Sequence, residues 1–302
     1  MTAVLPLLRR RQWAAIGYLS AWKLVRYLPE QLGRTLFTVA ATTIATRRGE
    51  STPVRQLRRN LARVTGLPAG DPHLEDLVTA ALVSYARYWY EVFAFDRLIA
   101  AHGDELVVDG IDNVDPTQGA IITITHSGNW DMAGYAYTRE RGSFVTITER
   151  LKPHELFDAF VAYRESLGFT VLAHSKDSGK PGEKKPFERL VDHVNAGMVA
   201  IFPGERDLTG TGVPVTFFGE EASFPAGPAA AAIRCGVPLH IGEVYFSSGS
   251  WCARIHPALE VTTVEETTQR IAAGFEQTLR AHPQDWHMLQ AVWGADRADS
   301  RK

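Results

Sequence analysis

Cysteine is scarce in this chain of 302 residues, and its two positions, Cys235 and Cys252, match neither a disulfide framework nor a zinc-ligand spacing. Two cysteines in a chain of this size are typical of a reducing compartment. Long apolar runs are missing too: none approaches the roughly 18 residues of a spanning helix, so we expect no transmembrane helix. The segment Trp13–Trp22 follows three arginines but lacks an A-x-A-like cleavage site, which argues against a cleaved signal peptide.

Acidic residues are nearly missing from the first 63 positions, where Glu30 and Glu50 oppose twelve basic side chains. The rest of the chain holds 20 basic and 32 acidic residues, so the formal net charge of −2 conceals a basic end of +10 and an acidic body of −12. The basic side chains are Arg9, Arg10, Arg11, Lys23, Arg26, Arg34, Arg47, Arg48, Arg55, Arg58, Arg59 and Arg63. Such an end favours an anionic partner surface, either nucleic acid or lipid headgroups.

Over about residues 1–48, large apolar side chains alternate with these arginines. The pattern is typical of amphipathic helices that lie in the plane of a membrane interface, with arginine stems reaching toward phosphate groups. An ordinary N-terminal helix, packed on the body with a solvated basic face, is the alternative. Because no recognition motif for nucleic acid accompanies the charge, we expect an anionic membrane surface and no nucleic acid as the partner.

A second helix is expected over about 74–98, and we assign its aromatic stripe to the core. From about 105 to 260, β-branched runs alternate with helical patterns, which predicts an α/β core with a mixed, largely parallel central sheet covered by helices. The expected strands are 105–109, 120–125, 144–148, 170–173, 198–202, 213–218, 238–246 and 253–255. One helix is expected to begin near residue 129. Further helices are expected over 153–167, 186–196, 229–233 and 264–281. We expect one domain over 1–302, including the helical basic N-terminal region.

The sharpest local signal is the segment HSGNWD, His126–Asp131, between an apolar strand and a helix. Functional side chains gather in such turns because a helix N-terminus offers free N–H groups and a positive dipole end. An imidazole oriented by a carboxylate is a general base, and His126 with Asp131 supplies both groups. A plain loop histidine beside a helix cap is the alternative, and the same two residues with Glu205 form a chemically possible metal set.

Two further blocks follow the expected strands. Phe202–Asp207 places Glu205 and Arg206 at the carboxyl end of a strand, where Glu205 can position a base or an acceptor and Arg206 can meet phosphate. A surface turn with a solvated charge cluster is the other interpretation. The small residues of Gly212–Gly219 and Phe224–Pro228, with the alanines after them, suit either a passing acyl chain or plain packing.

Together these blocks resemble the lysophospholipid-acyltransferase-like superfamily, and within it the lipid A biosynthesis acyltransferases. The resemblance covers about residues 10–293. It includes the H-x-x-x-x-D signature in an HSGNWD-type context and a strand that leads into a Gly-plus-acid turn. It also includes the R-x-x-x-G element Arg164–Gly168, the stretches GVPVTFFG and FPAGPAA, and the aromatic element Pro283–Met288.

Within that branch, the sequence is most similar to the phosphatidylinositol mannoside acyltransferases of actinobacteria. Asp131 within NWD, where many relatives carry Glu, and the turn Gly204–Asp207, in place of a common Gln/Asp-type turn, favour this group. The resemblance implies transfer of a palmitoyl-type chain from acyl-CoA to a mannose hydroxyl of a phosphatidylinositol mannoside. It implies no cofactor and a peripheral location at the cytoplasmic face of the plasma membrane.

The resemblance also implies site roles. His126 takes the proton of the acceptor hydroxyl, Asp131 orients its ring, Glu205 holds His126 or the sugar, and no covalent intermediate forms. Backbone N–H groups near Gly128 and Asn129 are expected to bind the oxyanion. The expected substrate-binding residues are Ser127, Gly128, Asn129, Arg164 and Arg206, with the two arginines meeting phosphate. No resident metal is expected.

Other functions stay open from the sequence. The acceptor can instead be a lipid A precursor or a lysophospholipid, and the donor can be an acyl carrier protein, although the acidic body favours CoA over an acidic carrier. A thioester hydrolase that uses His126 would release fatty acid without any acceptor. A non-enzymatic lipid-binding protein would keep its function after His126→Ala.

Overall fold

The structure is a computed structural model that describes residues 17, 24–47, 51–149, 154–174, 184–207, 210–247 and 249–299. Two sequence expectations fall largely outside this part of the chain. They are the first of the N-terminal amphipathic helices, before residue 24, and the loop expected after residue 174. The strands and helices after these segments can be compared with the sequence directly.

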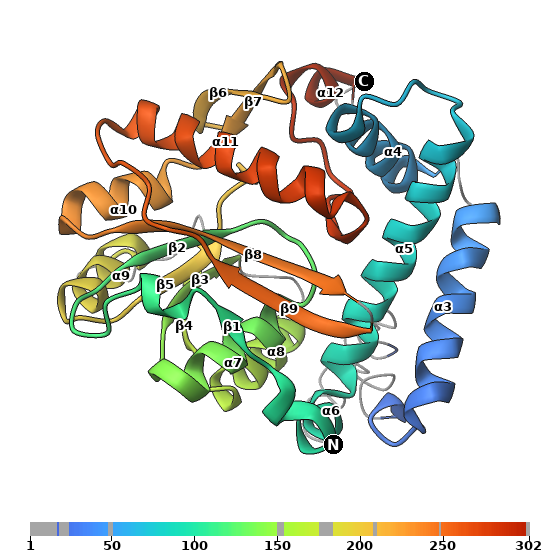
Figure 1. Cartoon of the computed structure of the whole chain (residues 1–302), viewed down its shortest axis with the longest axis horizontal. Coiled ribbons are helices and arrows are strands. Elements are labelled where there is room, and N and C mark those ends of the chain that lie inside the picture. Colours follow the sequence, from blue (N-terminus) through green and yellow to red (C-terminus); the bar gives the residue numbers. More distant parts are fainter. Residues whose placement is uncertain are drawn as a thin grey trace.

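Within the described residues, seven strands form one sheet in the order β1-β9-β8-β2-β5-β3-β4 (Figure 1). Its strands are β1 Val108–Asp109, β2 Ile121–Ile124, β3 Val145–Glu149, β4 Thr170–His174, β5 Ala200–Pro203, β8 Leu239–Ser247 and β9 Ser250–Ile255. All neighbouring strands are parallel except β8 and β9, which form an antiparallel hairpin. The predicted α/β fold with a mixed, largely parallel central sheet is therefore confirmed.

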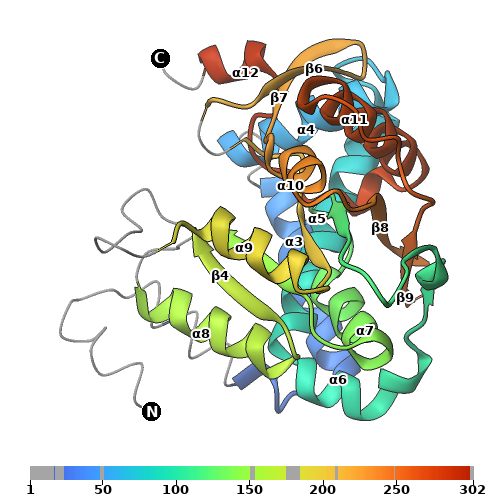
Figure 2. The same ribbon diagram turned by 90° about the vertical axis from the view of Figure 1, so that its left-hand side faces the viewer.

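Helices cover both faces of this sheet. In chain order they are α3 Glu30–Arg47, α4 Thr52–Thr65, α5 Pro72–Phe93, α6 Phe95–His102, α7 Trp130–Arg141, α8 His154–Ser166, α9 Pro186–Asn195, α10 Gly227–Cys235, α11 Val264–Ala281 and α12 Gly294–Asp299. Short 3-10 turns lie at Gly103–Glu105, Ile111–Asn113 and Pro283–Asp285. Figure 2 shows the edge strand β4 between α8 and α9, which lie on opposite faces.

Side chains of β2 point alternately to the two faces of the sheet, which explains why helices cover both faces. Ile121 packs with residues of α9, α10 and α11, whereas Ile122 packs with residues of α5, α7 and α8. Successive side chains of a strand point to opposite faces, so a strand without charged residues must be covered on both sides. Its carboxyl end, which carries the HSGNWD turn, consequently opens between the two helical layers.

Some elements differ from the sequence expectations. The helix expected over 74–98 ends at Phe93 and resumes as α6 after Ala94. The strand expected over 105–109 is only the two-residue β1, after a 3-10 turn. Neither α4 nor β7, Glu220–Phe224, was expected, and β7 pairs with β6, Val213–Phe217, in a separate antiparallel hairpin.

Helix α3 lies along α5 at one side of the molecule (Figure 1) and buries little of itself. Its buried residues are Gly33 and Ala41. Large apolar side chains on α3 and just before it are instead exposed: Leu24, Tyr27, Leu32, Leu36, Val39 and Ile44. None of the helices in the described part of the chain combines the length and apolar character needed to cross a bilayer.

Candidate active site

The two turns that carry the expected catalytic residues are adjacent because their strands are. Strands β2 and β5 are parallel neighbours, with Ile124 opposite Pro203, so both chains leave the sheet at the same edge. Gly204 continues the pairing, since its N–H donates to the carbonyl of Ile124 at 2.9 Å. A side chain at this position would place its Cβ only 2.2 Å from Thr123 Oγ1, so glycine allows the two turns to approach.

His126 is paired with Glu205. The ring Nδ1 of His126 lies 2.8 Å from Glu205 Oε1, and the His126 backbone N–H donates to the same oxygen at 2.6 Å. Trp286 Nε1 donates to it more weakly, at 3.4 Å. Glu205 is fully buried, whereas the His126 side chain is 37% exposed. Glu205 thus anchors an imidazole whose other edge remains open.

Electrostatics favours a carboxylate at Glu205. Burial alone would raise the pKa of this carboxyl group, but the charge of His126 and the hydrogen bonds from its ring and backbone outweigh burial and lower the pKa. A carboxylate only accepts hydrogen bonds, so Nδ1 of His126 must carry the hydrogen. The unprotonated nitrogen of the neutral ring is then Nε2, which can accept a proton.

Asp131 has partners other than the ring of His126. Its Oδ1 accepts from Arg164 Nε at 2.8 Å and its Oδ2 from the Tyr88 hydroxyl at 3.0 Å, and the carboxylate is fully buried. Burial, followed by the negative charge of Asp131, holds the pKa of Tyr88 well above 10. Burial disfavours the charged form of Arg164, yet the pKa of Arg164 is raised because Asp131 compensates. Asp131 therefore stabilises a cation and a neutral phenol.

The three residues between His126 and Trp130 are held by protein contacts. Ser127 Oγ lies 2.8 Å from Thr125 Oγ1. The Gly128 N–H, expected to face an oxyanion, donates to the carbonyl of Asp285 at 3.0 Å. Gly128 has φ +54°, and a Cβ there would lie 2.8 Å from backbone atoms of β8, so only glycine fits. The Asn129 side chain is buried and caps α7 by accepting from Met132 N at 3.1 Å.

A cavity of about 600 Å³ opens beside His126. Aromatic side chains of α5 and α8 form much of its wall, and Arg164 and Arg206 also line it. Arg206 lies 3.8 Å from Glu149 and is one-third exposed, whereas Arg164 stacks on Trp130 at 4.2 Å. The volume is typical of a site for a small organic ligand. One cavity therefore joins the imidazole of His126, two guanidinium groups and an apolar wall.

A second histidine, His287, lines the same cavity. Its backbone N–H donates to the carbonyl of His126 at 2.8 Å, and its Nε2 lies 3.0 Å from Ser84 Oγ. Burial, assisted by the charge of His126, lowers the pKa of His287 to about 3, so its ring is neutral near pH 7. Ser84 also donates to Asp285 at 2.6 Å.

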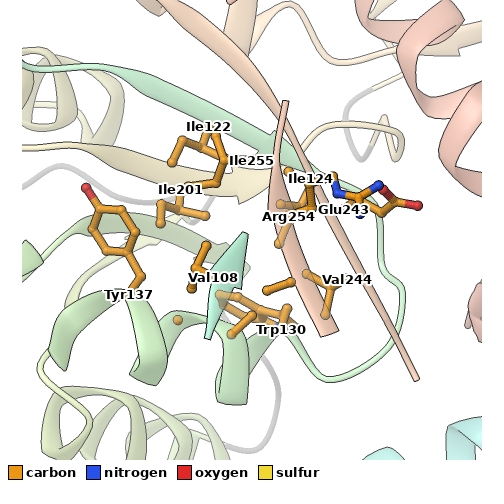
Figure 3. A pocket seen from close by; sticks show the side chains of 14 residues that line it. Val108, Ile122, Ile124, Trp130, Tyr137, Ile201, Glu243, Val244, Arg254 and Ile255 are labelled. Atoms are coloured by element: carbon orange, nitrogen blue, oxygen red, sulfur yellow. The ribbon is translucent and has the colours of Figure 1, made fainter. Parts of the chain in front are cut away.

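A smaller cavity of about 40 Å³ lies between the sheet and α7 (Figure 3). Its wall includes Ile122, Ile124 and Ile201 from the sheet and Tyr137 from α7, and Trp130 belongs to the walls of both cavities. This volume has room for only a few water molecules. The larger cavity is therefore the candidate substrate site.

The described residues contain no group of three or more His, Cys, Asp or Glu side chains arranged to hold a metal ion. The three residues considered as metal ligands, His126, Asp131 and Glu205, do not share one set of contacts. Glu205 is bound to His126, and Asp131 is bound to Arg164.

Sequence reasoning missed Tyr88, Trp286 and His287 as parts of the site. Tyr88 belonged to the aromatic stripe that we assigned to the core, and nothing in a helical spacing distinguishes a tyrosine that binds a carboxylate. Trp286 and His287 lie in the aromatic element of the family resemblance, but the roles of their ring nitrogens depend on contacts across more than 80 residues.

Fold and site together define an α/β protein with a histidine–glutamate pair beside a cavity, and the family follows from sequence comparison. The profile of the family described as bacterial lipid A biosynthesis acyltransferase matches residues 5–294. The chain therefore belongs to this acyltransferase family, as the sequence motifs indicated.

Curated relatives make the comparison more specific. A phosphatidylinositol mannoside acyltransferase of Mycolicibacterium smegmatis is 42% identical over 294 residues, covering 95% of this chain and 93% of the relative. One of Mycobacterium tuberculosis is 42% identical over 301 residues, covering 96% and 90%. A solved structure, translation initiation factor eIF-2B of Pyrococcus horikoshii OT3, covers 82% of this chain and 91% of its own at 12% identity. Its TM-score of 0.26 is too low to bear on this fold.

Proposed function

We propose that the protein transfers a long-chain fatty acyl group, of the palmitoyl type, from acyl-CoA to a mannose hydroxyl of a phosphatidylinositol mannoside. The proposal includes direct transfer without a covalent acyl-enzyme intermediate, at the cytoplasmic face of the plasma membrane. The names of the two mycobacterial relatives support the acceptor.

The observation that carries the chemistry is the His126–Glu205 pair on the wall of the 600 Å³ cavity. A ring with Nδ1–H held by a buried carboxylate has Nε2 free to take a proton, and the carboxylate stabilises the imidazolium that forms. A positioned base of this kind contributes roughly 10²–10⁴-fold to a rate. Glu205, which we expected to hold either His126 or the sugar, is assigned the first role.

The reaction balances without any further reactant. Nε2 of His126 removes the proton from the acceptor hydroxyl as its oxygen attacks the thioester carbonyl. The tetrahedral intermediate then expels the CoA thiolate, which takes the proton back from the imidazolium. The products are an ester and free CoA. Because Gly128 N–H is occupied by Asp285, the Asn129 backbone N–H at the start of α7 is the remaining expected oxyanion donor.

The other polar groups of the cavity are assigned to anionic parts of the substrates. Arg164, fixed by Asp131, and Arg206, 3.8 Å from the exposed Glu149, can meet phosphate groups of the acceptor or of CoA. The aromatic wall suits an acyl chain. The cavity between the sheet and α7, at about 40 Å³, is too small for such a chain, whereas the larger one, at about 600 Å³, adjoins His126.

The membrane surface is assigned to α3. Leu32, Leu36 and Val39 lie on one exposed face of this helix, about three or four residues apart. Between residues 24 and 47 the only acid is Glu30, and its carboxylate binds Arg34 at 2.9 Å. An exposed apolar helix face with little negative charge suits the interface of an anionic bilayer.

The membrane assignment is tested by sedimentation with vesicles that contain phosphatidylinositol. Leu36→Glu with Val39→Glu is expected to abolish binding. The matched control is Thr35→Glu with Thr42→Glu, which adds the same charge at exposed polar positions of the same helix. If both double variants lose binding equally, charge alone explains the loss and the apolar face of α3 is not the contact.

Acyl transfer itself is tested with purified protein and labelled palmitoyl-CoA. The acceptors are phosphatidylinositol mannosides, a lipid A precursor and lysophospholipids, and palmitoyl-acyl carrier protein is compared as donor. His126→Ala is measured alongside. Transfer to the mannoside that disappears in the variant is the expected result.

The other outcomes separate the alternatives. Transfer only to another acceptor would refute the mannoside and keep the base. Release of fatty acid without acceptor would indicate a thioester hydrolase. Full activity of His126→Ala would refute the assignment of His126.

A further inference from the structure

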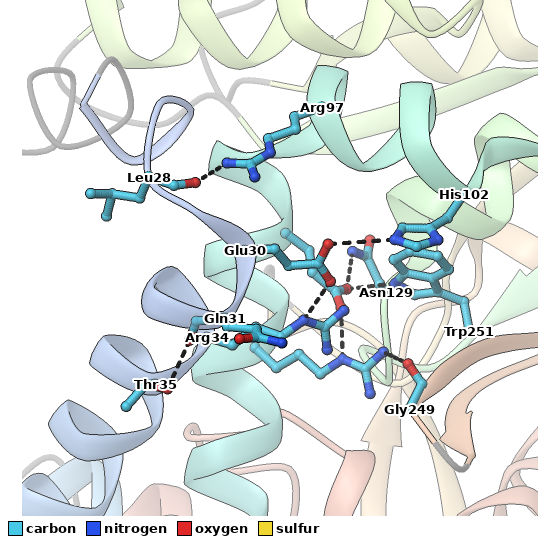
Figure 4. A network of polar contacts seen from close by, with 12 residues as sticks. Leu28, Glu30, Gln31, Arg34, Thr35, Arg97, His102, Asn129, Gly249 and Trp251 are labelled. Carbon is cyan, nitrogen blue, oxygen red and sulfur yellow. Dashed lines mark hydrogen bonds and ion pairs between the residues drawn. The ribbon is translucent and has the colours of Figure 1, made fainter.

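Glu91 of α5 is the centre of a buried polar network. Figure 4 labels three of its partners, Arg34, Asn129 and Trp251. Its carboxylate is fully buried and accepts from Arg87 Nε at 2.6 Å, Trp251 Nε1 at 2.7 Å and Asn129 Nδ2 at 2.8 Å. Arg34 of α3 approaches the same carboxylate at 3.9 Å. Donors from helix α5, strand β9 and the HSGNWD turn therefore converge on one side chain.

A carboxylate without solvent contact is strongly destabilising unless its oxygens are bonded and its charge is balanced. Arg87 balances the charge of Glu91, but Arg87 lies one turn away on the same helix and could do so at the surface. The contacts that require Glu91 to be buried are those with Asn129 and Trp251, which come from other elements and share Oε2. An apolar residue could fill this position if packing were its only role.

The side-chain amide of Asn129 is fixed because one end must accept a hydrogen bond and the other end must donate one. Its Oδ1 must accept from the N–H of Met132, and its Nδ2 must donate to Glu91, so only one orientation of the amide satisfies both. The first contact caps α7 and the second ties that cap to α5. Moving Glu91 would therefore move the start of α7.

The same face of α5 holds the turn at a second point. Tyr88, three residues before Glu91, donates to Asp131, the second residue of α7. His126 is held on its other side by Glu205. The turn is thus held between α5 and the end of β5.

We infer that Glu91 is a positioning residue, which sets the HSGNWD turn through Asn129 and so keeps His126 aligned in its cavity. The inference rests on the acyl transfer proposed above. Glu91 is fully buried and does not line the cavity, so we expect no contact between Glu91 and substrate. Its loss is expected to lower kcat while leaving KM for either substrate nearly unchanged.

The test uses the full chain with Glu91→Gln, Asn129→Asp and the two combined. Glu91→Gln sets an amide N–H₂ against the donors around it, and Asn129→Asp sets two carboxylates against each other. Each is expected to lower kcat about 100-fold, the loss typical of a misplaced catalytic group. In the combined variant, the new amide at position 91 donates to a carboxylate at position 129 that still caps α7.

The combined variant is expected to recover kcat at least about tenfold over either single variant, within the range of coupling between contacting residues. Recovery is partial because Trp251 Nε1 shares Glu91 Oε2 with Asn129 and loses that acceptor. Asp296→Asn is the matched control. Asp296 is a buried carboxylate that binds Arg63 and Gln56 far from the turn, so this change should lower stability without lowering kcat of the folded protein.

A second readout requires no substrate. Hydrogen exchange at the amides of His126, Gly128 and Met132 is expected to be faster in both single variants and slower again in the combined one. Unchanged kcat in Glu91→Gln, or no recovery of kcat and exchange in the combined variant, would refute the positioning role. If wild-type protein shows no acyl transfer, the proposed function fails, and exchange still decides whether Glu91 sets the turn.

Discussion

Two buried carboxylates, Glu205 and Asp131, lie near His126 and bind different partners. Glu205, after β5, binds the ring and backbone N–H of His126. Asp131, in the first turn of α7, binds Arg164 and Tyr88. Both are excluded from solvent, so their partners, rather than their exposure, distinguish them.

This difference in partners gives the two carboxylates different expected roles: Glu205 acts on the protonation of His126, and Asp131 on the charge of Arg164. A carboxylate bonded to an imidazole selects the tautomer and stabilises the imidazolium. A carboxylate bonded to a guanidinium makes a buried cation tolerable, and it does not select the tautomer of an imidazole that is bonded to another carboxylate. We therefore expect Glu205 to control the rate of proton transfer, and Asp131 to control stability and the placement of Arg164.

The largest effect is expected for Glu205→Gln. The amide oxygen can keep the contacts of Glu205 Oε1, but a neutral amide no longer stabilises the imidazolium that forms when His126 takes a proton. We expect kcat to fall about 1,000-fold, measured as acyl transfer at saturating substrates. Asp207→Asn is the control, because this carboxylate in the same turn binds the N–H groups of Gly210 and Gly212. Equal losses in both variants would mean that the conformation of the turn matters, and not the charge of Glu205.

A smaller effect on rate, with a large effect on stability, is expected for Asp131→Asn. Removing one partner of a buried ion pair leaves Arg164 uncompensated, which destabilises by about 3–5 kcal/mol in denaturant unfolding. We expect kcat to fall by at most about 100-fold, through displaced groups. The combined variant Asp131→Asn with Arg164→Gln should recover stability without recovering rate. A larger loss of kcat than in Glu205→Gln would reverse the two assignments.

Much of the structure around His126 could be predicted from the sequence, because its parts follow one another along the chain. The apolar run of β2, the HSGNWD turn and the capped start of α7 are continuous in the chain, and the expected boundaries agree with the structure within one or two residues. The parallel pairing of β2 with β5 then brings Glu205 to His126, as the position of both residues after strands suggested.

The partners of Asp131 could not be predicted in this way. The H-x-x-x-x-D spacing sets both residues near one turn, but side-chain direction depends on how α7 packs. Arg164 and Tyr88 reach Asp131 from α8 and α5, 33 and 43 residues away along the chain. Helical periodicity marks Tyr88 as buried without indicating a carboxylate beside its hydroxyl.

The smallest expected effect concerns His287, an imidazole of the same cavity whose ring lies against a hydroxyl group, Ser84 Oγ, where the ring of His126 has a carboxylate. Its folded pKa of about 3 lies below the ordinary 6.5, so the unfolded chain binds a proton in this range that the folded protein does not. The free energy of unfolding should therefore be insensitive to this group above pH 6.5. It should fall, by at most about 1.4 kcal/mol per pH unit, as the pH drops below that value.

His287→Gln should remove this contribution, which denaturant unfolding between about pH 7 and 5 can measure. That window lies above the range in which Glu205, whose pKa is lowered, loses its own stabilising charge. His73→Gln, at an exposed position of α5, is the control and should keep the wild-type slope. If His287→Gln keeps that slope as well, His287 can be charged in the folded protein. Burial beside His126 would then not be what distinguishes the two imidazoles, and the carboxylate on His126 would no longer be a sufficient reason to propose His126, and not His287, as the base.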